Sequence, residues 1–169
     1  MDDRAVVADQ LGREPRAFRR VVVRCPFGYP AVTEQSPYDE GGAPFPTTYW
    51  LTCRHLAAAV SRLEAAGGVE RWSDAVRADE DLADSLARAN AEQREIRRAL
   101  ANGGPWPDGG ASLELGIGGA SRAGSLKCLH VHAAYALAHP DYELGRRILE
   151  QVDPLWPRDR CCSAPRAGT

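Results

Sequence analysis

The sequence lacks any apolar run that approaches the 20 or so residues needed to span a lipid bilayer. Its first residues, Met1 to Arg4, are mostly charged and contain no apolar signal core, so we expect a cytoplasmic protein. It also lacks an excess of one charge, because the formal net charge is −2. The whole molecule therefore has no preference for polyanions.

A basic stretch between residues 13 and 24 contains five arginines. No DNA- or RNA-binding motif accompanies them, and a solvated edge around a strand explains them equally well. We therefore expect neither a membrane nor a nucleic acid as a partner. The sequence does not identify a protein partner.

No two cysteines have the CxxC spacing that usually marks a small zinc knuckle. In a reducing compartment, five cysteines favour metal ligation or reactivity over a disulfide framework. Two of them, Cys161 and Cys162, lie in a segment rich in Pro, Arg, Ser and Gly. We predict a flexible C-terminal tail over residues 156–169 and assign these two cysteines at most an accessory role.

The whole sequence is 44% hydrophobic and 26% charged, which is typical of a globular protein. We predict one domain over residues 1–155. Strands are predicted at 18–24, 31–35 and 47–51, and their short connections favour antiparallel pairing. A further edge strand is predicted at 113–117. Helices are predicted at 3–11, from an N-cap at Thr52 to a stop at Gly67, at 72–101 as one helix or a pair, at about 126–138 and near 142–152. The fold class is α+β, a small antiparallel sheet of about three strands packed by four to five helices.

The helix near residue 126 contains the most informative residues of the sequence. With Ser125 as N-cap, Cys128 falls in the first turn, where the helix dipole favours a thiolate. Cys128 and His132 then share one face of a helix that is apolar on nearly all sides, which indicates burial. The alternative is a core cysteine and a histidine bonded to a carbonyl group.

Two other thiols lie at element boundaries, Cys25 at a strand end and Cys53 at a helix start. Together with Cys128 and one histidine they would supply a Cys₃His set for zinc. A [4Fe–4S] cluster with three cysteines fits equally well, and a metal-free reading makes Cys128 a nucleophile with a histidine as base. The short motif Lys127-Cys128-Leu129-His130 favours His130 as the histidine, whereas helix geometry favours His132. The predicted metal-site residues are Cys25, Cys53, Cys128, His130 and His132, and the expected cofactor is an iron–sulfur cluster or zinc.

A different class of function remains open beside this one. If the cysteines are purely structural, the protein is a non-catalytic interaction module that binds a partner through its helix at 72–101. The sequence does not decide whether the protein is an enzyme.

A glycine-rich loop over residues 116–125 leads into the helix at 126. Such loops can present free N–H groups to an anion, although this one matches neither a P-loop nor a dinucleotide fingerprint. We predict a small anionic ligand there, with structural glycines at a tight turn as the alternative. The anion-site residues are Gly118, Gly119, Ser121, Arg122, Ser125 and Lys127.

Three segments of the chain resemble the signature of the bacterial DUF501 family, a domain of unknown function. They are residues 24–32, 44–53 and 127–130, and the pieces at 10–13 and 116–119 are similar as well. The resemblance covers about residues 5–150 in matching order. It implies a bacterial and, from the Ala-, Arg- and Gly-rich composition, actinobacterial cytoplasmic protein, but it implies no activity.

Overall fold

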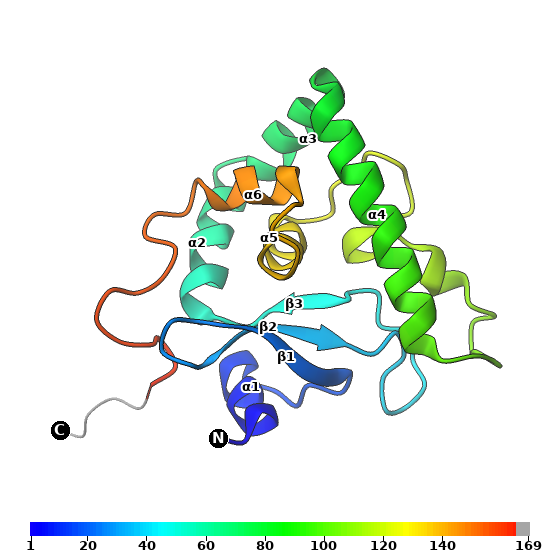
Figure 1. Ribbon diagram of the computed structural model, residues 1–169, viewed down its shortest axis with the longest axis horizontal. Coiled ribbons are helices and arrows are strands. Elements are labelled where there is room, and N and C mark those ends of the chain that lie inside the picture. The colour runs from blue at the N-terminus through cyan, green and yellow to red at the C-terminus, as the bar shows by residue number, and fades with distance from the viewer. Residues whose placement is uncertain (165–169) are drawn as a thin grey trace.

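Three short strands form an antiparallel sheet in the order β1-β2-β3, as the sequence predicts. The computed structural model describes residues 1–164, and Figure 1 shows most of the helices on one side of this sheet. Strand β1 spans Phe18–Arg24, β2 spans Pro30–Gln35 and β3 spans Tyr49–Leu51. The turn between β1 and β2 begins at Cys25, whose backbone N–H donates to the Tyr29 carbonyl at 2.9 Å.

Six α-helices accompany the sheet within residues 1–164, which confirms the α+β class. None of these helices combines the length and the apolar character that crossing a membrane requires. In chain order they are α1 (Asp3–Leu11), α2 (Arg54–Ala65), α3 (Gly68–Ala78), α4 (Glu80–Ala101), α5 (Leu129–Ala138) and α6 (Glu143–Leu149).

The structure decides one prediction that was open between a single helix and a pair, and it contradicts another. The helical region predicted at 72–101 is the pair α3 and α4, because the Asp79 side chain accepts hydrogen bonds from the backbone N–H groups of Asp81 and Leu82 and so caps a new helix. The edge strand predicted at 113–117 is wrong. Two short 3₁₀ turns, η1 (Ala111–Glu114) and η2 (Ile117–Gly119), occupy that region and bury their apolar side chains without strand pairing.

The start of α5 also differs from its prediction. Ser125 is not the N-cap, since its hydroxyl donates to the Arg122 carbonyl at 2.9 Å. Cys128 has an extended backbone, with φ −156° and ψ 162°, and is itself the N-cap residue. The helical periodicity used for Cys128 therefore begins only at Leu129.

Helix α5 lies at the centre of the molecule, between β3 on one side and α6 on the other (Figure 1). Most of its side chains are buried, as its apolar sequence predicts. Alanines on α5 allow α6 to approach closely, and a Cβ atom built on Gly145 would lie 2.6 Å from the Cβ of Ala136. The glycine is thus required by the packing of α6 against α5.

After α6 the chain runs along the outside of α2 and back to the sheet (Figure 1). The ring nitrogen Nε2 of His55, in α2, lies 2.9 Å from the Pro154 carbonyl oxygen. Near the end of this segment the Gln10 side-chain amide donates to both Pro30 and Ser163. Residues 155–164 therefore pack on the domain where the sequence predicts the start of a flexible tail. Residues 165–169 of that tail lie outside the described part of the chain.

Candidate metal centre

The structure separates the predicted thiols between the two ends of α2. Cys53 is the N-cap of this helix, whereas Glu64, which lies beside Cys128, is in its last turn. At about 1.5 Å per residue these two positions are roughly 16 Å apart along the helix axis. Cys25, Cys53 and Cys128 therefore do not form one shared site. Instead, two groups of donor atoms are present, one at each end of α2.

The first group combines a carboxylate, a thiol and an imidazole. Ligand atoms of Glu64, Cys128 and His130 all lie within 4.8 Å of one another. The carboxylate oxygen Oε1 of Glu64 is 2.5 Å from the backbone nitrogen of Leu129 and 3.0 Å from Nδ1 of His130. All three side chains are half-buried. The start of α5 thus carries the Cys and His donors, and the end of α2 supplies the carboxylate.

The orientation of the His130 ring is set by its other nitrogen. Nε2 lies 3.1 Å from the Ala57 carbonyl oxygen, which can only accept a hydrogen bond, so this nitrogen carries a proton. Nδ1 then faces the carboxylate. The hydrogen bond with the Cys128 side chain and, after it, the charge of Glu64 raise the pKa of His130 to about 9. In the metal-free protein the ring is therefore an imidazolium at neutral pH.

His132 lies elsewhere, in the core. It is completely buried, and its Nδ1 is 2.8 Å from the Tyr142 hydroxyl of the segment leading into α6. Burial lowers the pKa of His132 to about 4, so the ring is neutral at physiological pH. The sequence placed His132 on one face with Cys128, but Cys128 precedes the helix and that spacing does not apply. His132 is therefore not among the residues gathered around Cys128.

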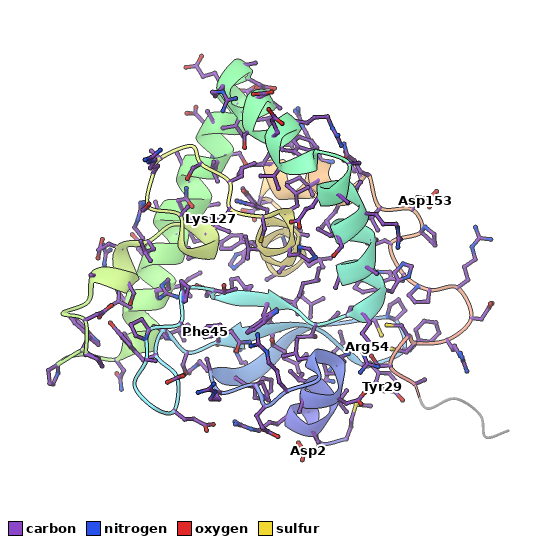
Figure 2. The ribbon with its side chains drawn as sticks, turned by 180° about the vertical axis from the view of Figure 1, so that it is seen from behind. Asp2, Tyr29, Phe45, Arg54, Lys127 and Asp153 are labelled. Atoms are coloured by element: carbon purple, nitrogen blue, oxygen red, sulfur yellow. The ribbon has the colours of Figure 1, made fainter. Side chains whose placement is uncertain are left out.

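The second group is made of four thiols at the N-terminal end of α2. The Sγ atoms of Cys25 and Cys161 are 3.7 Å apart, and those of Cys53 and Cys162 are also 3.7 Å apart. Figure 2 shows sulfur atoms beside the labelled Arg54, the first residue of α2. No site was predicted for Cys161 and Cys162, to which the sequence assigns at most an accessory role. Their adjacency was the available signal, because two consecutive thiols can meet two partners at once.

The protonation of the four thiols differs. Burial raises the pKa of Cys53 to about 12 and also raises the pKa of Cys161. Burial opposes ionisation at Cys162 too, but hydrogen bonds from the backbone N–H of His55 and from the Cys53 thiol outweigh it and lower the pKa of Cys162. The N-terminus of α2 thus favours a thiolate, as helix N-termini do, on a residue from the C-terminal segment.

Several backbone N–H groups of the glycine loop before α5 are bonded within the chain. Gly116 donates to the Ala120 carbonyl at 2.8 Å, Ile117 to the Asn90 side chain at 2.8 Å and Gly119 to the Gly116 carbonyl at 3.0 Å. Gly118 has φ +68°, and a Cβ atom there would lie 2.7 Å from Val131. These contacts account for the glycines as turn residues.

The cations next to this loop are exposed, and the first N–H group of the helix beside it is already bonded. The side chains of Ser121, Arg122 and Lys127 are exposed. The N–H of Leu129, at the start of α5, already donates to the Glu64 carboxylate. The anion expected at this helix N-terminus is thus provided by the protein itself, and an external anion remains a prediction.

A family model described as "Protein of unknown function (DUF501)" matches residues 21–150. The chain belongs to the DUF501 family. No curated protein and no solved structure matches it. The residues that match the DUF501 model include Cys25, Cys53, Glu64, Cys128 and His130, whereas Cys161 and Cys162 lie beyond them.

Proposed function

We propose that this DUF501 protein is a metal-binding protein that holds a zinc ion between Glu64, Cys128 and His130. The supporting observation is the convergence of one oxygen, one sulfur and one nitrogen donor within 4.8 Å of one another. Zinc accepts all three types of ligand, at distances near 2.0–2.3 Å.

The hydrogen bond of His130 supports the same assignment. A histidine that ligates a metal usually donates its other ring N–H to a carbonyl or carboxylate, which fixes the ring. His130 already makes such a bond from Nε2 to the Ala57 carbonyl at 3.1 Å. Nδ1 would then be the nitrogen that faces the ion, and it would release its proton on binding.

Three protein ligands leave one coordination position of a tetrahedral ion open. Structural zinc sites normally fill all four positions with protein side chains, whereas catalytic sites keep one for water or substrate. A zinc-bound water has a pKa near 7 and acts as a nucleophile at neutral pH. The proposed site is therefore of the kind that supports hydrolytic chemistry. A thiol ligand also fits the reducing conditions of the cytoplasm, where we place the protein.

Zinc binding to metal-stripped, reduced protein tests this proposal. The background for the test is Cys161→Ser combined with Cys162→Ser, which removes one thiol from each pair at the other end of α2 and leaves no thiol pair there to compete for zinc. In that background Cys128→Ser, His130→Gln and Glu64→Gln should each weaken zinc binding by at least about tenfold, the lower end of the loss seen for residues that merely support a ligand.

The matched controls are His139→Gln and Glu92→Gln, which alter a second His–Glu pair with 3.3 Å between Nδ1 and the carboxylate. They should bind zinc like the background protein. Equal affinity in the ligand variants and the controls would contradict the proposal.

A further inference from the structure

The four thiols at the N-terminal end of α2 are arranged as two pairs. Cys25 follows β1 and meets Cys161, and Cys53 precedes α2 and meets Cys162. Cys25, Cys53 and Cys161 are buried and Cys162 is half-buried. Thiolates are the ligands that zinc, copper(I) and iron–sulfur clusters select, so four thiols gathered from three separate parts of the chain suit a metal centre.

The sulfur–sulfur distances indicate how many metal ions the thiols suit. A tetrahedral metal with metal–sulfur bonds of about 2.3 Å holds its sulfur ligands about 3.8 Å apart. Each pair, at 3.7 Å, matches two ligands of one such ion. A single ion with four thiolates would bring all four sulfurs to this distance. Within residues 1–164, however, the one set of three donors that lies mutually within 4.8 Å is the Glu64 group.

The surroundings provide a hollow beside two of the four thiols and a backbone hydrogen bond to one of them. A hollow of about 370 Å³ borders Cys161 and Cys162 and is lined by His55 and residues of the segment 157–164. The backbone N–H of Ser163 donates to the Cys161 sulfur at 3.4 Å. Hydrogen bonds to the sulfurs are one of the means by which proteins tune iron–sulfur clusters.

The charged residues around the four thiols also suit a cluster with a net negative charge. Arg158 and Arg160 line the hollow, whereas Arg54, the first residue of α2, is paired with Asp9. Two ferric ions, two sulfides and four thiolates together carry a net charge of −2, which these cations and the N-terminus of α2 offset. Asp159 is the one acidic residue among those that line the hollow.

We propose that Cys25, Cys53, Cys161 and Cys162 bind a [2Fe–2S] cluster, with Cys25 and Cys161 on one iron and Cys53 and Cys162 on the other. Four cysteine thiolates are the usual ligand set of this cluster. The thiols release their protons when they bind iron. The cluster also joins the C-terminal segment to the sheet and to α2, so loading it stabilises the packed form of residues 155–164.

The test is performed on the full chain, expressed with iron supplementation and purified without oxygen. We expect two iron atoms and two acid-labile sulfides per chain and a brown colour. Dithionite, as the electron donor, should add one electron to each cluster, bleach the visible absorption and produce the paramagnetic signal of a reduced binuclear cluster. These readouts are taken on the unaltered protein and do not depend on whether a variant folds.

Variants then locate the cluster. Cys25→Ser, Cys53→Ser, Cys161→Ser and Cys162→Ser should each lose the iron, the sulfide and the paramagnetic signal. Cys128→Ser is the matched control, since it removes a thiol of the Glu64 group and should retain both iron atoms. Circular dichroism of each variant identifies loss of iron that results from unfolding.

Three results would overturn the proposal. One is a colourless protein that holds a single zinc ion at these four thiols. Another is a pair of disulfides, Cys25–Cys161 and Cys53–Cys162, in the anaerobic protein. The third is full iron content in Cys161→Ser. None of these results bears on zinc at Glu64, so the two proposals fail independently.

Discussion

The carboxylate of Glu64 caps helix α5 by accepting a hydrogen bond of 2.5 Å from the backbone N–H of Leu129. Cys128, the N-cap residue, makes no side-chain capping bond of its own. Glu64 lies 65 positions before Leu129, yet its side chain performs the capping role that a Ser, Thr, Asp or Asn at the N-cap position usually performs. The bond ties the end of α2 to the start of the central helix and places the carboxylate beside His130.

This cap predicts a cost when the carboxylate is removed. Glu64→Ala should lower the free energy of unfolding of the metal-free protein by about 1–2 kcal/mol, because a capping bond in a half-buried setting is lost. Glu64→Gln keeps an acceptor oxygen and should cost less. Urea denaturation of both variants checks this. A larger loss for Gln than for Ala would contradict the capping role.

The approach of α6 to α5 predicts that Gly145 tolerates no side chain. Gly145→Ala should destabilise the protein by about 1–3 kcal/mol, the usual cost of overpacking a core. The added Cβ would lie 2.6 Å from both the Ala136 Cβ atom and the His132 carbonyl oxygen. Thermal unfolding measures the effect. Gly41→Ala is the control, since its nearest atom, an Asp39 carboxylate oxygen, is at 3.4 Å.

The neutral, buried His132 predicts a loss of stability in acid. Its pKa falls from 6.5 to about 4 on folding, so the unfolded chain binds the proton more readily. Stability is fully present above pH 6.5 and falls as the pH drops toward 4. The loss contributed by this group approaches about 3 kcal/mol, at roughly 1.4 kcal/mol per pKa unit.

Chemical denaturation at several pH values isolates this contribution. His132→Gln removes the titrating ring, so its stability should change less between pH 6.5 and pH 4 than that of the unaltered protein. His55→Gln, which replaces a half-buried histidine of α2, should keep the full dependence. Equal slopes for the His132 variant and the unaltered protein would show that another group dominates.

The thiols of the cluster-free protein should differ in reactivity. Cys162 is half-buried and has a lowered pKa, whereas its neighbour Cys161 is 4% exposed and has a raised pKa. Because the thiolate is the reacting species, iodoacetamide should label Cys162 before Cys161. Peptide mass spectrometry after short exposures distinguishes the two positions. Faster labelling of Cys161 would contradict the described burial of the segment.

Local sequence patterns predicted much of the fold. The β-forming runs identified all three strands, and the apolar sequence of α5 identified it as a buried helix, because both signals repeat within a few residues. The predicted start of α5 was wrong. Ser125 was assigned as the N-cap because serine is a good capping residue in isolation. Its hydroxyl instead bonds to Arg122, and a distant carboxylate takes over the cap.

The two groups of donor atoms at the ends of α2 are formed by residues far apart in the sequence, so no local pattern predicts them. Cys25 and Cys161 are separated by 136 residues, and Glu64 and His130 by 66. Cys128 and His130 share a short motif and were recognisable, but their carboxylate partner was not. The composition of the C-terminal segment suggested flexibility, whereas its contacts with Cys25, Cys53 and Gln10 are made through the tertiary fold.

The wide separation of the paired thiols has a consequence for biosynthesis. Because translation is directional, Cys25 and Cys53 leave the ribosome early. Cys161 and Cys162 follow only after nearly all of the domain has been made. The nascent chain therefore passes through a stage in which the sheet and α2 can form while their thiols still lack partners. If the proposed cluster forms, its iron and sulfide would reach this end of α2 only after the synthesis of the C-terminal segment. A ribosome stalled before Cys161 would display two unpaired thiols to cellular oxidants and metals.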